Sequence, residues 1–186
     1  MIHFVASIEM IACWFAWAYP FILRAPHNQK RASITLAGVT RIGLALEAVA
    51  IFIAWACRFP ADDGPGLPRI LLSMVLGPLA AVLSWSAVKH LGRQFRVHAG
   101  LYDDHELVRT GPYTVVRHPI YSSLLAMLLC TLFVLTPWEW AAASLALFIA
   151  GTEIRVRAED RLLASRFGEE FYAYRKQVRA YIPFVR

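Results

Sequence analysis

The chain has 186 residues, of which 58% are hydrophobic and 17% charged, and its mean hydropathy is +0.48. A soluble domain is usually about 45–50% apolar and about 25% charged, so this composition excludes an ordinary soluble domain. The net charge of +6 does not indicate a nucleic-acid-binding protein, because the basic residues lie between apolar blocks, where they set membrane topology. We expect one integral membrane domain, residues 1–186.

Five apolar blocks of near membrane-spanning length follow one another along the chain. We predict an all-α, polytopic membrane helix bundle with one transmembrane helix in each block. Gly77-Pro78 should bend the third helix, because a proline inside a helix removes a backbone hydrogen bond. The fifth helix should continue beyond the membrane as a charged helix. The predicted spans are residues 2–23, 34–57, 70–89, 119–135 and 138–154.

The positions of lysine and arginine predict the orientation of the bundle. Sixteen of them lie in three segments on one side, residues 24–31, 89–117 and 155–186. The loop 58–69, on the other side, carries only Arg58 and Arg69. The more basic side faces the cytoplasm. We therefore expect the N-terminus outside and the C-terminus inside, in a bacterial inner (cytoplasmic) membrane.

The segment after the fifth span has the apolar periodicity of an amphipathic helix on the cytoplasmic side. The residues that carry this periodicity are Leu163, Phe167, Phe171, Tyr174 and Val178. Gly168 is typical of a helix C-cap and should divide the segment into two helices, the second ending at Pro183. Two arrangements stay open for this part: a lid over the end of the bundle, which we favour, or a helix lying on the membrane surface.

A polar, turn-forming stretch, residues 105–121, separates the third and fourth spans. Gly111-Pro112 marks a turn, and Pro119 suits the first position of a helix. A helix start offers free N–H groups and the positive end of the helix dipole, and Arg117 and His118 add side-chain donors there. We predict a small-molecule site at this helix start, although His118 could instead only cap the helix.

Glu159-Asp160 lies about one turn beyond the fifth span, among arginines. It could be a solvated helix face held by ion pairs between residues four apart. It could also place a carboxylate opposite residues 105–121, where it would hold a cationic or hydroxyl-bearing ligand. The pairs expected for a solvated face are Arg155–Glu159 and Glu153–Arg157.

Two further carboxylates, Glu9 and Glu47, lie near the middle of the first two spans. An ionisable group at that depth is costly, so each is a candidate functional residue. The alternative is a protonated or hydrogen-bonded structural glutamate, and both interpretations stay open.

The residues that could bind a metal show no ligand spacing typical of a metal site. They are the cysteines Cys13, Cys57 and Cys130, and the loop residues His98, Asp103, Asp104 and His105. The cysteines lie in apolar segments and are expected to be free buried thiols. The loop histidines are expected to form local hydrogen bonds, so no metal site is predicted.

Two ordered motifs lie on either side of the last two spans. The first reads His105-x-Leu107-Val108, Gly111-Pro112-Tyr113 and Val116-Arg117-His118-Pro119-x-Tyr121. The second reads Glu159-Asp160-x-Leu162, Phe167-Gly168, Tyr172, Tyr174 and Pro183. Together they resemble the signature of the isoprenylcysteine carboxyl methyltransferase and phospholipid methyltransferase superfamily. The resemblance covers about residues 90–184, and the first two spans carry no recognisable signature.

The resemblance implies an integral membrane enzyme that takes S-adenosylmethionine as its methyl donor and transfers the methyl group to a lipophilic or lipid-modified acceptor. It implies a cytoplasmic cofactor pocket, built within residues 90–184 by the last two spans and the C-terminal helix. The cofactor-binding residues it implies are His105, Leu107, Val108, Tyr113, His118, Pro119, Tyr121 and Glu159. Arg117 and Glu159 would be catalytic, with Arg117 orienting the acceptor. The family commonly has Glu-Glu where this chain has Glu159-Asp160.

Two other functions stay open at this point. Integral-membrane sterol reductases use NADPH and have a stretch similar to Arg117–Tyr121, but they are usually longer. A non-catalytic scaffold or transporter would fit the carboxylates within the spans, yet five spans without a repeat argue against the inverted-repeat transporter plan. Isoprenylated cysteine, a phospholipid amine, a quinone-like lipid and a small thiol are all compatible acceptors.

Overall fold

The structure is a computed structural model, and it describes residues 2–23, 34–35, 37–60, 63–92, 100–101 and 106–185. These ranges are almost entirely helical, with one short pair of strands. The elements are α1 (Ile2–Leu23), β1 (Ile34–Thr35), α2 (Ala37–Ala56), α3 (Leu67–Leu91), β2 (Gly100–Leu101), the 3-10 helix η2 (Gly111–Thr114), α4 (Pro119–Leu135), α5 (Trp138–Phe167) and α6 (Glu169–Gln177).

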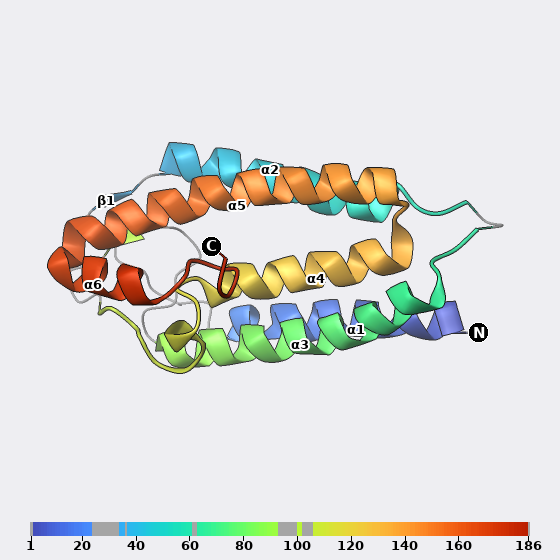
Figure 1. Ribbon diagram of the computed structural model, residues 1–186, viewed down its shortest axis with the longest axis horizontal. Helices are drawn as coiled ribbons and strands as arrows, with labels where there is room; N and C mark the ends of the chain where they lie inside the picture. Colours follow the sequence, from blue (N-terminus) through green and yellow to red (C-terminus); the bar gives the residue numbers. More distant parts are fainter. Residues whose placement is uncertain are drawn as a thin grey trace.

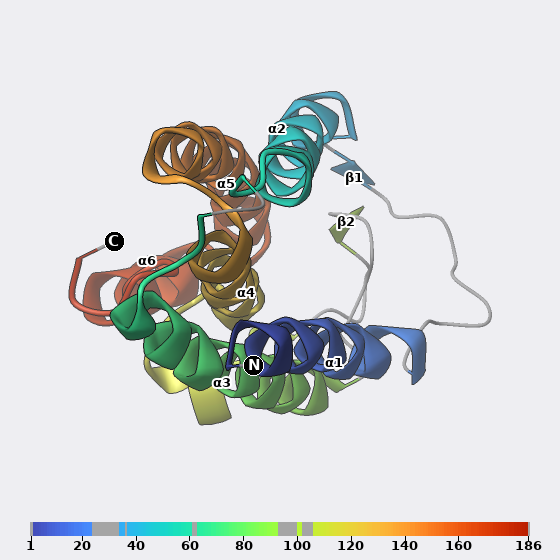
Figure 2. The same ribbon diagram turned by 90° about the vertical axis from the view of Figure 1, so that its right-hand side faces the viewer.

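The five long helices lie side by side along the long axis of the molecule (Figure 1). Helix α5 packs mainly on α2, and α3 packs on α1 and α4. Viewed along the bundle, α4 lies between the pair α2–α5 and the pair α1–α3 (Figure 2). The N-terminus is at one end, whereas α6 and the segment that leads into α4 are at the other (Figure 1). Residues far apart in the sequence therefore meet at the end that carries α6.

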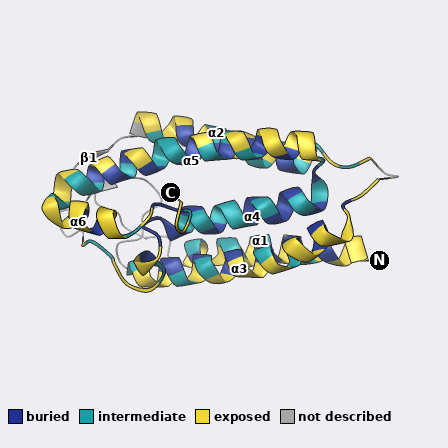
Figure 3. Cartoon of the chain, viewed as in Figure 1, coloured by how far each residue is buried: buried dark blue, intermediate teal, exposed yellow. Residues whose placement is uncertain are grey.

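Within the part of the chain that the structure describes, three helices are long and apolar enough to cross a membrane, namely 22 residues from Ile2, 19 from Gly38 and 25 from Leu67. Helix α4 is apolar but shorter, with 17 residues. Exposed residues cover much of the outer faces of α1, α2 and α3 (Figure 3), and many of them are large and apolar, such as Phe4, Phe15 and Phe52. Such surfaces are unfavourable in water and suit a bilayer. The protein is an integral membrane protein.

Small residues allow the helices to approach closely. A Cβ atom added at Gly43 of α2 would lie 2.7 Å from the carbonyl oxygen of Gly151 on α5. A Cβ at Gly77 of α3 would lie 3.0 Å from Sγ of Cys13 and 3.2 Å from Sγ of Cys130. Close backbone contact of this kind is the usual way in which membrane helices associate. The three cysteines are free, as predicted; Cys13 and Cys130 are also buried, whereas Cys57 is only partly buried.

The predicted helix bounds are confirmed for α1 and α4, and α5 continues to Phe167 as expected. The second helix begins later than predicted, because Ile34–Thr35 forms β1 and pairs antiparallel with β2. Helix α3 runs unbroken from Leu67 with Pro78 inside it, and its predicted bend stays a prediction.

The predicted loop 58–69 is too long, because Arg69 lies in the first turn of α3. Gly66 caps α3 and a proline follows in its first turn, so Arg69 is helical and only 8% exposed. Its guanidinium lies 4.2 Å from the Trp138 ring centroid. It donates to three carbonyls at the end of α4, those of Leu132 (2.6 Å), Phe133 (3.2 Å) and Thr136. The Leu132 carbonyl also accepts from the backbone N–H of Thr136. Arg69 thus adds side-chain donors for the carbonyls at the C-terminal end of α4.

The end of the chain also differs from the prediction. Gly168 ends α5 with φ +50°, as expected of a C-cap, and α6 follows at once. However, α6 ends at Gln177 and does not reach Pro183. Val178 is extended, and Arg179 pairs in parallel with Val116. This pairing with the segment before α4 explains why the last helix is short.

Candidate functional site

The C-terminal segment is bonded to the first residues of α4. The backbone N–H groups of Arg117 and His118 donate to the carbonyls of Arg179 (2.7 Å) and Ala180 (2.8 Å). The hydroxyl of Ser122 donates to the carbonyl of Tyr181 at 2.6 Å. Residues 179–181 therefore cover the helix start at which the sequence predicted a site.

Asp160 is the centre of a buried polar cluster at this helix start. Its Oδ1 lies 2.9 Å from Nε2 of His118, and its Oδ2 accepts from Nη2 of Arg117 at 2.9 Å. Arg117 also donates to the carbonyl of Val178. All three charged side chains are less than a tenth exposed. The Nε of Arg117 is buried and has no hydrogen-bond partner among the described residues.

Glu159 is the most accessible member of the cluster. Tyr121 donates its hydroxyl hydrogen to Glu159, and Nδ1 of His118 lies 3.3 Å from Oε2 of the same carboxylate. The Glu159 side chain is 28% exposed. We call the five residues Arg117, His118, Tyr121, Glu159 and Asp160 the His118–Asp160 network. Glu159 is the member that a ligand could reach without displacing a buried group.

Arg155 connects this network to α2. It forms an ion pair with Glu47, and Thr152 donates to the same carboxylate at 2.9 Å. Its guanidinium also lies 4.8 Å from the ring centroid of Tyr121. The sequence predicted an ion pair of Arg155 with Glu159. This prediction is wrong, because the ion pair of Arg155 is with Glu47. The close approach of α2 and α5 places Glu47 beside Arg155 instead.

The other predicted ion pair, Arg157 with Glu153, is confirmed at 3.3 Å. Arg157 is 68% exposed, so this pair contributes little. The Oε1 of Glu153 also accepts from the hydroxyl of Tyr181 at 2.9 Å. One face of α5 is thus solvated, as one interpretation of the sequence proposed, while Asp160 on another face is buried.

The segment before α4 is held against α6. Tyr174 donates its hydroxyl hydrogen to the carbonyl of Tyr113 at 2.6 Å, and both side chains are buried. Arg109 pairs with Glu170 at 2.5 Å. Gly111 has φ +59°, and a Cβ there would overlap the ring of His90, so this turn requires glycine.

The pKa shifts in the network follow from burial and from its hydrogen bonds. Burial lowers the pKa of His118, but its bonds to Asp160 and Glu159 outweigh burial, and the net pKa is raised. Burial raises the pKa of Asp160, but the hydrogen bonds and charges of His118 and Arg117 lower it to about 2. The shifts favour an ionised Asp160 beside a protonated His118.

The structure brings together most of the residues predicted for the site. Those that meet around α5 are Arg117, His118, Pro119, Tyr121 and Glu159, with Tyr113 held nearby by α6. Leu107 and Val108 are half-buried in the segment before η2, and no polar contact joins them to the network. His105 lies outside the described residues.

Sequence reasoning missed the central place of Asp160 and the pairing of Glu47 with Arg155. The motifs predict roles for Arg117 and Glu159 but none for Asp160, although the Arg-His dipeptide offers it two possible donors. Glu47 carried a usable signal, since a carboxylate inside a span needs a partner. The described residues hold no group of three or more metal-ligating side chains arranged for a metal ion. The predicted absence of a metal near residues 98–105 falls largely outside the described residues.

Comparison with known proteins gives a family match over about half of the chain. The profile of the isoprenylcysteine carboxyl methyltransferase (ICMT) family matches residues 71–165. The chain is 30% identical over 121 residues to a probable protein-S-isoprenylcysteine O-methyltransferase of Oryza sativa subsp. indica. That alignment covers 64% of this chain and 60% of the rice protein.

Two other relatives show a similar extent of match. A protein-S-isoprenylcysteine O-methyltransferase of Tribolium castaneum is 32% identical over 121 residues, covering 64% of this chain and 41% of its own. The cobalt-zinc-cadmium resistance protein CzcN of Cupriavidus metallidurans is 34% identical over 126 residues, covering 65% of this chain and 53% of its own. Each alignment therefore spans less than two thirds of the relative's length. The family match takes in half of the chain, including the whole His118–Asp160 network, and the protein belongs to the ICMT family.

Proposed function

We propose that the protein transfers a methyl group from S-adenosylmethionine to the carboxylate of a lipophilic acceptor of the isoprenylcysteine type. The observation that carries this proposal is the His118–Asp160 network, which lies at the end of a membrane helix bundle and within the family match. The names of the relatives support methyl transfer to isoprenylcysteine.

The site would lie at the cytoplasmic face of a five-span bundle formed by one domain, residues 1–186. Helix α4 and the apolar part of α5, residues 138–154, each have 17 residues and a length of about 25 Å, close to the thickness of the hydrocarbon core. The end that carries α6 also carries the basic residues of 106–117 and 155–185, which favours an N-terminus outside and a C-terminus inside. The bacterial inner membrane is the location that we propose.

The residues of the network fit S-adenosylmethionine in charge and in hydrogen bonding. The cofactor carries a carboxylate, an ammonium group, hydroxyls and a sulfonium. The partly exposed carboxylate of Glu159 could accept from the ammonium or the hydroxyls. The buried Nε of Arg117 lacks a partner and could donate to a carboxylate of the cofactor or of the acceptor. We propose Tyr113, His118, Pro119 and Tyr121 as further parts of the cofactor site, with His105, Leu107 and Val108 preceding them.

When bound, the cofactor supplies an electrophilic methyl group, and an O–C bond forms at the acceptor as the S–C bond breaks. A carboxylate acceptor is already ionised, so no general base is needed. His118, fixed by Asp160, would hold Glu159 in place, and Arg117 would orient the acceptor. The cover formed by residues 179–181 would limit access of water to the helix start, which favours reaction of a desolvated carboxylate.

The test is to incubate the purified protein with labelled S-adenosylmethionine and a total membrane lipid extract, and to identify the product by mass spectrometry. We expect label in a lipophilic methyl ester, from which mild base releases methanol. A base-stable N-methyl product would indicate an amine acceptor and contradict the carboxylate part of the proposal. Saturable binding of NADPH without affinity for S-adenosylmethionine would contradict methyl transfer and favour the reductase alternative.

A further inference from the structure

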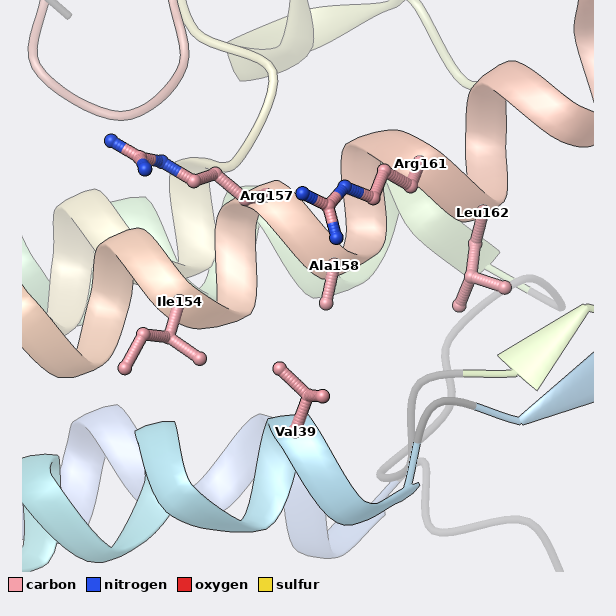
Figure 4. Close-up of a pocket in the computed structure, with 6 residues that line it drawn as sticks. All are labelled: Val39, Ile154, Arg157, Ala158, Arg161 and Leu162. Carbon is pink, nitrogen blue, oxygen red and sulfur yellow. The ribbon is translucent and has the colours of Figure 1, made fainter.

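A groove with a cavity volume of about 400 Å³ lies between the first part of α2 and the second half of α5 (Figure 4). None of its lining residues belongs to the His118–Asp160 network. The groove is lined by Val39, Ile154, Arg157, Ala158, Arg161 and Leu162.

The groove combines an apolar floor with two cations. Ile154, Ala158 and Leu162 point from α5 toward α2, and Val39 points back at them (Figure 4). Arg157 and Arg161, which are one helical turn apart, extend along the neighbouring side of α5 (Figure 4). Both arginines are exposed. A ligand in the groove would meet hydrocarbon on one side and positive charge on the other.

The position of the groove along α5 places it at a membrane boundary. Trp138 and Trp140 are 63% and 48% exposed at the start of α5, as in the aromatic belt of one interface. At 1.5 Å per residue, Ile154 lies about 24 Å, Arg157 about 28 Å and Arg161 about 34 Å from Trp138. A hydrocarbon core is about 30 Å thick, so the arginines reach the opposite headgroup region.

The floor of the groove ends inside this boundary and is open to lipid. Val39 is 48% exposed, and Ile42, one turn further along α2, is 59% exposed. An acyl chain can therefore pass from the bilayer onto the floor without crossing a polar surface. The arginines lie where the phosphate of the same lipid molecule would be.

We propose that this groove binds an anionic phospholipid of the surrounding bilayer. The phosphate lies between Arg157 and Arg161, and the first part of an acyl chain lies on the apolar floor. Guanidinium groups suit this role because they pair with phosphate through two parallel N–H donors. The ion pair of Arg157 with Glu153 is exposed and weak, so it does not prevent the contact.

Lipid binding by the full-length protein in mixed micelles tests this proposal, with native mass spectrometry as the readout and phosphatidylglycerol compared with phosphatidylcholine. The double variant R157Q/R161Q should bind phosphatidylglycerol roughly tenfold more weakly, with phosphatidylcholine unchanged. The double variant R157K/R161K should keep most of the affinity. The matched control R166Q/K176Q removes the same charge at exposed positions outside the groove and should bind phosphatidylglycerol normally.

Unchanged phosphatidylglycerol binding in R157Q/R161Q, or an equal loss in R166Q/K176Q, would overturn the proposal. Displacement of the lipid by millimolar glycerol 3-phosphate would also overturn it, because a soluble anion would then occupy the site without an acyl chain. If the double variant does not elute as a folded protein, the single variant Arg161→Gln replaces it, with an expected loss of roughly threefold. None of these readouts depends on methyl transfer.

Discussion

Nε2 of His118 lies 2.9 Å from Oδ1 of Asp160, and both side chains are 6% exposed. The histidine comes directly before α4, and the aspartate lies in the part of α5 that extends beyond its apolar segment. The other oxygen of the carboxylate accepts from Arg117. The Asp160 side chain therefore joins α5 to the start of α4. The partly exposed Glu159 lies beside this contact.

Replacement of Asp160 by asparagine should strongly destabilise the protein. Arg117 would lose the negative charge that it pairs with, although an asparagine oxygen could still accept from it, and removing one partner of a buried ion pair costs roughly 3–5 kcal/mol. The apparent melting temperature in detergent measures the effect. Glu170→Gln is the control, because its pair with Arg109 is about half exposed on both sides and should contribute no more than about 1 kcal/mol. Equal shifts in the two variants would contradict the central role of Asp160.

The raised pKa of His118 predicts a fall in stability with rising pH. Protonated His118 is favoured in the folded state, so its contribution is complete below the unfolded pKa of about 6.5. The contribution is lost as the pH rises through the higher folded pKa. Melting temperatures measured between about pH 6 and pH 9 should fall, and His118→Gln should flatten the slope. A slope that is unchanged in His118→Gln would show that another group causes it.

The two carboxylates inside the spans should behave differently. Glu47 holds Arg155 beside Tyr121, which in turn bonds Glu159, whereas Glu9 lies on α1. Glu47→Gln should weaken binding of S-adenosylmethionine about tenfold, since it removes one charge-assisted hydrogen-bond partner. Glu9→Gln is the matched control and should bind the cofactor like the wild type. If both variants bind S-adenosylmethionine with equal affinity, Glu47 does not support the cofactor site.

Replacement of Arg69 should lower the stability of the protein without lowering its affinity for the cofactor. Arg69→Met removes the side-chain donor to the carbonyls of Phe133 and Thr136, and a buried carbonyl that loses its donor costs about 1–3 kcal/mol. The melting temperature should fall clearly, while cofactor affinity in the folded fraction should stay normal. Arg58→Gln, which removes an exposed arginine bonded to one carbonyl, should have little effect on either quantity. An equally large effect of Arg58→Gln would contradict the capping role of Arg69.

Local patterns were enough to predict much of the fold. The apolar block after Pro119 defined α4, and Gly168 marked the division between α5 and α6. The error at the end of the chain has a tertiary cause, because Arg179 and Ala180 bond to the backbone of Arg117 and His118, which lie far earlier in the sequence. Periodicity along the chain cannot reveal a bond of that kind.

The sequence was enough to predict which residues form the site, but not which of them contact one another. The motifs around His118 and Glu159 pointed to one site, and the structure brings these two residues within 3.3 Å. The ion pair of Glu47 with Arg155 joins residues 108 positions apart and depends on the close contact of two glycines, one in each helix. Asp160 was undervalued because its shorter side chain departs from the family pattern, yet that side chain reaches both Arg117 and His118.

The most direct test of the central claim is methyl transfer from labelled S-adenosylmethionine to an S-farnesylcysteine derivative with a free carboxylate. The wild-type protein should form a methyl ester from which base releases the label, and Glu159→Gln should lose at least about nine tenths of this activity. The same derivative with its carboxylate already esterified should accept no label. Failure of the wild type to methylate the free carboxylate, or equal labelling of the esterified compound, would contradict the account.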